Sequence, residues 1–230
     1  MGQLWDGFVE AIRLIFTLDS TVLEITFRTV LVSGTATLLA MAVGVPLGYA
    51  LARGRFRGRN IALGLVYTGM GFPPVVVGLF VWLMLVRSGP LGDLELIYTR
   101  QAMVIAQFVI SVPLVIGFTA ASIQSLPPRL GDLLASLGAG RIRTLVYLAR
   151  EARLGLLAAV MAGFGAVISE VGASQTVGGN LEGETRVLTT AIVLATSRGQ
   201  NEQAIALGVI LLSLALAVNL LLTFVQQRPR

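Results

Sequence analysis

Apolar residues in this chain occur in long runs that are separated by short polar segments. A helix needs about 20 mainly apolar residues to cross a bilayer, so five runs predict membrane-crossing helices. They cover residues 25–52, 61–86, 101–123, 154–171 and 204–225. The pattern therefore predicts an all-α integral membrane protein with about five transmembrane helices.

The first 20 residues predict a different kind of helix. Leu4, Phe8, Ile12 and Ile15 fall near one helical face, while charged residues interrupt every apolar run. About fifteen residues are too few to cross a membrane. We therefore expect an N-terminal helix that lies at the membrane interface, within residues 1–20, rather than a further span.

Two apolar segments are not simple spans. The run 61–86 contains Pro73 and Pro74, which cannot donate backbone hydrogen bonds, so its helix must kink or unwind there. This break is interpreted either as a packing kink or as part of a translocation path. The segment 187–195 holds only about nine apolar residues, which predicts a short re-entrant helix. A Gly44–Gly48 pair in the first span permits close contact with another helix.

Arginine counting predicts the orientation. All 17 basic residues are arginines, and 11 of them fall on one side of the predicted topology. Four lie in the loop 53–60 and five in the polar segment 127–153. The arginine-rich side is expected to be cytoplasmic, with the N-terminus outside and the C-terminus inside. A nucleic-acid surface is disfavoured, because these arginines sit in loops held between spans.

The composition excludes several kinds of chemistry. The chain contains no histidine and no cysteine, so histidine bases, thiolate nucleophiles and the usual zinc ligands are absent. We expect no catalytic residue and no metal site. No GxxxxGK[ST] nucleotide-binding motif occurs either. If ATP drives this protein, another chain must hydrolyse it.

The polar segment 127–153 reads as a helix, a glycine break at Gly138 and a second helix. Asp132, Gly138 and Leu148 resemble the glutamate, glycine and isoleucine of the EAA loop found in permeases of binding-protein-dependent ABC importers. The Leu-Pro that ends that motif is replaced here by Arg150 and Glu151. An ordinary solvated loop is the alternative for this segment.

A second motif, within residues 168–180, makes the resemblance more specific. Ile168 to Ala173 reads ISEVGA, and a Gly-Gly-Asn sequence follows at residues 178–180. These residues resemble the signature of molybdate, sulfate and tungstate permeases, and residues 185–196 are most similar to the tungstate branch. The resemblance covers residues 26–224, which predicts one permease domain over residues 21–226.

The resemblance implies a type I ABC importer permease fold in the cell (inner) membrane. The implied partners are a second copy of the chain, cytoplasmic ABC ATPase subunits, an extracytoplasmic oxyanion-binding protein and membrane lipid, but no nucleic acid. ATP and Mg would be bound by the ATPase, and no cofactor by this chain. ATP-driven closure of the ATPase pair would switch the pore between inward-facing and outward-facing states. The coupling helix, about residues 130–140, would dock on the ATPase through Asp132, Leu133, Leu134, Ala135, Leu137, Gly138, Ala139 and Arg141.

Residues of the predicted gate and translocation path are Pro73, Pro74, Glu170, Gly172, Thr176, Asn180 and Thr185. A carboxylate near a membrane helix end is costly unless it is paired. Because a carboxylate repels oxyanions, we interpret Glu170 as a structural clamp that pairs with an arginine or with the amides of Gly172 and Ala173. Thr176, Asn180 and Thr185 are candidate neutral donors to a passing anion, although such loops are usually simple turns.

The function predicted from the sequence is ATP-driven import of tungstate or a related oxyanion. Molybdate, sulfate or another small solute is the nearest alternative. A stand-alone ion-coupled carrier would need several buried ionisable groups, and an intramembrane enzyme would need catalytic side chains that this chain lacks.

Overall fold

The computed structural model describes residues 2–17, 19–127 and 129–227. Within these ranges every regular element is helical and no strand occurs, which confirms the all-α prediction. The helices are α1 Gly2–Phe16, α2 Ser20–Arg53, α3 Arg59–Met70, α4 Pro74–Leu85, α5 Arg100–Gln124, α6 Arg129–Ser136, α7 Arg141–Glu151, α8 Arg153–Ile168, α9 Gly172–Gly178, α10 Leu188–Ser197 and α11 Asn201–Gln227, with a 3₁₀ turn η1 at Gly92–Leu94.

Three of the described helices, α2, α5 and α11, are long and apolar enough to cross a membrane alone. Two pairs satisfy the same criterion only if each pair is one bent span: α3 with α4, and α7 with α8. By length and composition, the described residues therefore hold three candidate spans, or up to five when each bent pair counts as one. The upper number equals the number of predicted runs, but the fourth run, residues 154–171, corresponds to α8 without α7, which meets α8 at 80°.

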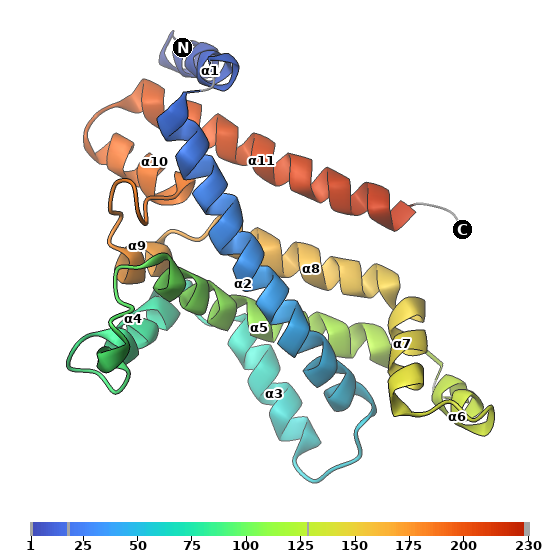
Figure 1. Cartoon of the computed structure of the whole chain (residues 1–230). Coiled ribbons are helices and arrows are strands. Elements are labelled where there is room, and N and C mark those ends of the chain that lie inside the picture. Colours follow the sequence, from blue (N-terminus) through green and yellow to red (C-terminus); the bar gives the residue numbers. More distant parts are fainter. Residues whose placement is uncertain (1, 18, 128, 228–230) are drawn as a thin grey trace.

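Helix α5 lies at the centre of the bundle, with α2 and α8 packed along it (Figure 1). A Cβ atom on Gly44 would lie 2.8 Å from Val115 Cγ1, and one on Gly48 would lie 2.7 Å from Thr119 Cβ. These glycines therefore let α2 approach α5 more closely than a larger residue would allow. The predicted close contact is confirmed.

The predicted break in the second run is sharp. Helices α3 and α4 meet at an angle of 102°. The amide of Phe72 still donates to the carbonyl of Gly69 at 3.3 Å, but Pro73 has no N–H and adopts an extended conformation. The helix resumes at Pro74, because a proline in the first turn needs no hydrogen-bond partner for its nitrogen.

Other boundaries differ from the predictions. The fourth run was expected to reach Val171, but α8 ends at Ile168, so Glu170 lies in a break and not in a span. Helix α9 was not predicted, because its seven residues are polar and glycine-rich. Such a short helix is stabilised by packing and not by its intrinsic propensity. The short helix α10, Leu188–Ser197, was predicted and is confirmed.

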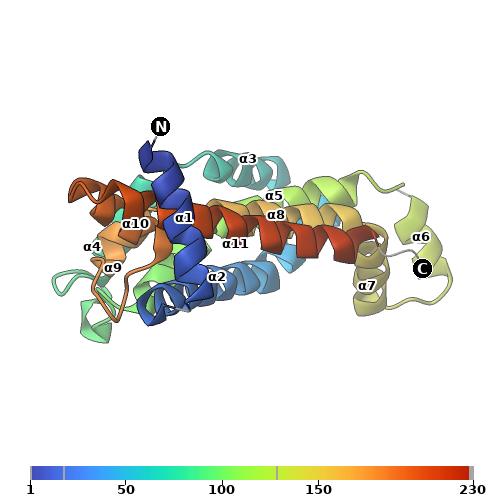
Figure 2. The same ribbon diagram turned by 90° about the horizontal axis from the view of Figure 1, so that it is seen from above.

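Helix α1 crosses the beginning of α11 (Figure 2). Ala11 is fully buried, and a Cβ on Gly7 would lie 2.6 Å from Ile205 side-chain atoms. The small residues of α1 therefore face α11. Leu14 packs against a buried cluster that includes Leu207 of α11. Four other large apolar residues of α1 are exposed, namely Trp5, Phe8, Val9 and Ile12.

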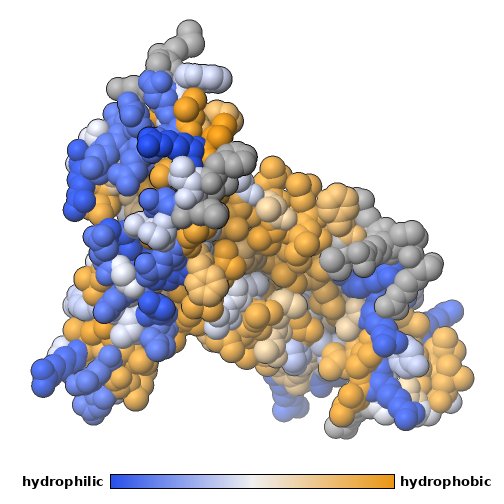
Figure 3. All heavy atoms as spheres, turned by 45° about the horizontal axis from the view of Figure 1, so that its top comes forward, coloured by the Kyte–Doolittle hydropathy of each residue, from blue (hydrophilic) through white to orange (hydrophobic). Residues whose placement is uncertain are grey.

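The bundle has two polar ends with an apolar surface between them. Helices α9 and α10 lie at one end, here called the α10 end, and α6 and α7 lie at the other, the α7 end (Figure 1). Figure 3 shows a broad hydrophobic surface between hydrophilic ends on the face that it presents. This distribution is the one expected of a protein that spans a bilayer.

Candidate functional site

The predicted gate residue Glu170 is buried in the break between α8 and α9. Its Oε1 accepts a hydrogen bond of 2.8 Å from the amide of Ala173. Its backbone carbonyl accepts a bond of 3.0 Å from the hydroxyl of Thr189 in the first turn of α10. Among the described residues no arginine forms an ion pair with it. The sequence allowed either an arginine or a backbone amide as the partner of Glu170, and the structure has the amide of Ala173. Through these two bonds Glu170 links α8, α9 and α10.

Helix α4, which begins at Pro74, packs directly on α9. A Cβ on Gly78 would lie 2.5 Å from the Cα of Ala173, and a Cβ on Gly172 would overlap the side chain of Val75. The proline break and the Glu170 break are thus brought together, although they are almost 100 residues apart in the sequence. A buried apolar core surrounds this contact and is shared by α2, α4, α5 and α9. It consists of Val32, Val77, Val81, Leu85, Ala102, Met103, Ala106, Ala173 and Val177, together with Val187 next to α10.

The three predicted neutral donors have different surroundings. The hydroxyl of Thr176 donates to the carbonyl of Gly172 at 2.8 Å, within its own helix. Thr185 is buried, donates to Gly178 O at 2.5 Å and accepts from the amide of Leu181 at 2.9 Å. The hydroxyls of Thr176 and Thr185 therefore both donate to carbonyls within the protein. Asn180 has a positive φ of 53° and a buried Oδ1 without a hydrogen-bond partner.

Two arginines from distant helices hold the loop between α9 and α10. Arg28 of α2 donates to the carbonyls of Arg186 and Gly183, both at 2.8 Å, and pairs with Glu24. Arg100, the first residue of α5, donates to the carbonyls of Glu184 at 2.8 Å and Gly183 at 3.3 Å. These bonds satisfy loop carbonyls that have no partner in a helix or strand.

Sequence reasoning missed the role of Arg28, which it counted only as an orientation charge. The available signal was a charged residue inside an apolar run, with Glu24 one helical turn before it. The side chain of Arg28 is only 3% exposed. A guanidinium that is this deeply buried needs several acceptors, and here they come from the loop 183–186.

At the α7 end, Gly138 provides the break that the sequence predicted. Its φ is 79°, a left-handed conformation that favours glycine. The amide of Ala139 then donates to the carbonyl of Leu134 at 2.9 Å, which closes the end of α6. Helix α6 ends at Ser136 and is shorter than the predicted coupling helix of residues 130–140.

The leucines of α6 have two orientations. Leu130 and Leu134 pack against a buried cluster of Ile123, Leu148 and Ala152, which connects α6 and α7 to α5. Leu133, and Leu137 directly after the helix, point away from this cluster and are 56% and 74% exposed. The side chains of Asp132, Ala135 and Arg141, which were predicted to share this surface, lie outside the described set, as do Arg228 and Arg230.

Comparison with known proteins identifies the architecture. Residues 44–230 match the family of binding-protein-dependent transport system inner membrane components. The inward-facing methionine ABC transporter MetNI has the same fold, with a TM-score of 0.69 at 15% identity over 91% of this chain and 94% of that one.

Curated relatives extend over nearly the whole chain. A tungstate uptake system permease protein of Peptoclostridium acidaminophilum is 38% identical over 99% of this chain and 100% of its own length. A probable anion ABC transporter permease of Haloferax volcanii is 41% identical over 86% of this chain and 88% of its own. A molybdenum transport permease of Escherichia coli K12 is 26% identical over 84% of this chain and 87% of its own. With its bent spans, its α6–α7 segment and its family match over most of its length, the chain belongs to the binding-protein-dependent inner-membrane permease components of ABC importers.

Proposed function

We propose that this chain is the permease subunit of a tungstate importer and that two copies form the pore. The similarity to a tungstate permease over the full length of both chains carries this proposal. Molybdenum permeases cover less of the chain at lower identity, so molybdate is the second candidate. ATP hydrolysis with Mg belongs to a separate ATPase subunit, and the anion is delivered by an extracytoplasmic binding protein.

The ATPase docks on α6 in this proposal. Leu133 and Leu137 are one helical turn apart and form an exposed apolar pair. On the inner face, Leu134 contacts the cluster that contains Ile123 of α5 and Ala152 beside α8. A displacement of α6 is therefore transmitted through packed side chains to α5 and α8. This geometry supports the coupling role, with the α7 end in the cytoplasm.

The α10 end then faces outward and contains the gate. Here α4 and α9 pack at their glycines, and Glu170 fixes the break that precedes α9. A carboxylate that accepts a backbone amide is a clamp and not an anion ligand. A site where α4 packs on α9, and where Thr189 of α10 is bonded to the break before α9, is suited to open and close by small helix movements.

The test is reconstitution of the whole transporter. The permease is purified from native membranes with its ATPase, placed in liposomes, and assayed for ATPase activity with the binding protein loaded with tungstate, molybdate or sulfate. We expect co-purification of the ATPase and the largest stimulation with tungstate. Equal or greater stimulation by another anion would reject tungstate but keep the importer. A permease that purifies without any ATPase would reject the importer itself.

A further inference from the structure

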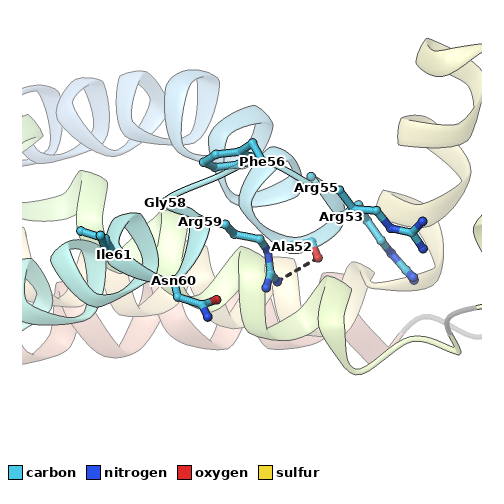
Figure 4. Close-up of a pocket in the computed structure, with 9 residues that line it drawn as sticks. Ala52, Arg53, Arg55, Phe56, Gly58, Arg59, Asn60 and Ile61 are labelled. Carbon is cyan, nitrogen blue, oxygen red and sulfur yellow. Dashed lines mark hydrogen bonds between the residues drawn. The ribbon is translucent and has the colours of Figure 1, made fainter.

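The loop between α2 and α3 borders an open cavity, which has no role in the function proposed above. The cavity has a volume of about 580 Å³ and lies at the α7 end. Figure 4 shows it between the last turn of α2 and the first turn of α3. Its lining consists of Ala52, Arg53, Gly54, Arg55, Phe56, Gly58, Arg59, Asn60 and Ile61.

The lining of this cavity contains basic side chains and no acidic one. Three arginines line it, and the sequence has no aspartate or glutamate between Glu24 and Asp93. Among the described residues, no carboxylate forms an ion pair with Arg55 or Arg59. The guanidinium groups of Arg55 and Arg59 can therefore attract a phosphate, which a guanidinium binds through two parallel hydrogen bonds.

One arginine is fixed and another is available. Arg59 donates from Nη2 to the carbonyl of Ala52 at 3.2 Å (Figure 4). It also donates from Nε to the carbonyl of Leu51 at 2.6 Å, and the two bonds cap the end of α2. Arg55 is exposed, and its side chain forms no hydrogen bond in the described part of the chain. The rim of the cavity is therefore rigid at Arg59, while the guanidinium of Arg55 can turn toward a ligand.

Large apolar side chains adjoin the arginines. Phe56 is 51% exposed, and Ile61 and Leu65, one turn apart on α3, are 71% and 68% exposed. These residues continue into the apolar outer surface of α3. A soluble anion would not bind to these apolar side chains. A phospholipid can bind to both groups, because its phosphate lies beside arginine and its acyl chains lie along an apolar helix.

We propose that this cavity binds the phosphate of an anionic phospholipid from the leaflet at the α7 end. Arg55 and Arg59 hold the phosphate, and Phe56 and Ile61 contact the adjoining glycerol and acyl region. The proposal requires only that the chain spans the bilayer, and it does not depend on the identity of the transported anion.

Spin-labelled phosphatidylglycerol and phosphatidylcholine test this site in the reconstituted transporter. The ratio of their association constants with the protein is measured for the wild type and for Arg55→Gln, Phe56→Ser and Arg87→Gln. Arg87 is exposed and lies near the α10 end, and its side chain forms no hydrogen bond with the residues that the structure describes, so its variant removes the same charge elsewhere. We expect Arg55→Gln to lower the preference for phosphatidylglycerol about fivefold, the usual effect of one arginine near a lipid surface.

The control variant should keep the wild-type preference. An equal loss with Arg87→Gln would overturn the proposal, because it would indicate a diffuse charge effect. Phe56→Ser keeps every charge and should weaken the binding of phosphatidylglycerol; unchanged binding in both loop variants would also overturn it. Excess sn-glycerol phosphate should not displace the lipid. Displacement would identify a site for soluble phosphates and reject the lipid.

Discussion

The carboxylate of Glu170 accepts a hydrogen bond from the amide of Ala173, three residues later, across the break between α8 and α9. It resembles the cap of a helix, in which a side-chain oxygen satisfies an amide that has no partner in the first turn. The same residue binds Thr189 through its carbonyl. One buried acid therefore fixes the relative position of three short elements at the α10 end.

Replacement of Glu170 tests whether the cap or the charge is needed. Glu170→Ala should lower stability by about 1–2 kcal/mol, because the amide of Ala173 loses its acceptor. Glu170→Gln keeps an oxygen acceptor and should retain most of the stability and transport. Thermal unfolding of the purified protein and uptake by liposomes measure the two effects. If the glutamine variant folds normally yet transports as poorly as the alanine variant, the negative charge itself is needed.

The contact between α4 and α9 should be sensitive to one methyl group. Gly78→Ala places a Cβ against the backbone of Ala173, and we expect a loss of about 1–3 kcal/mol from overpacking. Gly64→Ala on α3 is a matched control, because no atom lies within 4 Å of the added Cβ. The control should be neutral or more stable, since alanine favours a helix over glycine. Equal melting temperatures for the two variants would contradict this contact.

Arg28 should hold the loop between α9 and α10. Arg28→Met removes the donors to Gly183 and Arg186. The carbonyl of Gly183 keeps the bond from Arg100, so the main cost, about 1–3 kcal/mol, comes from the carbonyl of Arg186. We expect faster hydrogen exchange in the segment 181–187. Arg28→Lys should restore protection only in part, because an ammonium lacks the planar fork of a guanidinium. Arg87→Met, at an exposed position, should leave exchange in this segment unchanged, and an effect of similar size there would contradict the assignment.

Gly138 and Gly131 form a natural pair for testing the coupling segment. Gly138→Ala forces alanine into a left-handed conformation, at a cost of about 1–2 kcal/mol. Gly131 lies within α6, and its Cβ would meet no atom within 4 Å, so Gly131→Ala should be tolerated. We expect the first variant alone to reduce binding-protein stimulation of the ATPase. If Gly138→Ala retained full stimulation of the ATPase, the helix break at Gly138 would not be needed for coupling.

The interfacial position of α1 remains a prediction, and fluorescence can test it. Trp5 is 67% exposed and stacks on Phe8 with ring centroids 6.3 Å apart. In a Trp82→Phe variant Trp5 is the remaining tryptophan. Lipids brominated near the headgroup should quench its emission more than lipids brominated deep in the chain, because aromatic residues prefer the interface. Strong quenching by aqueous iodide without any lipid quenching would place α1 in water.

The sequence by itself determined the parts that depend on local composition. Long apolar runs predicted α2, α5 and α11, because a bilayer requires about 20 apolar residues whatever the neighbours are. The two prolines at 73 and 74 predicted the bend, since the missing N–H groups are a covalent property. The glycine at 138 likewise predicted the end of α6, and two short motifs indicated the permease family.

Only the tertiary structure decided the arrangement at the α10 end. Helix α9 has too little intrinsic propensity to be read from seven polar and glycine-rich residues, and it exists because it packs on α4 and α5. The bonds from Arg28 to the loop 183–186 join residues more than 150 positions apart. Local patterns do not contain such distant partners, because chain folding alone brings them within hydrogen-bonding distance.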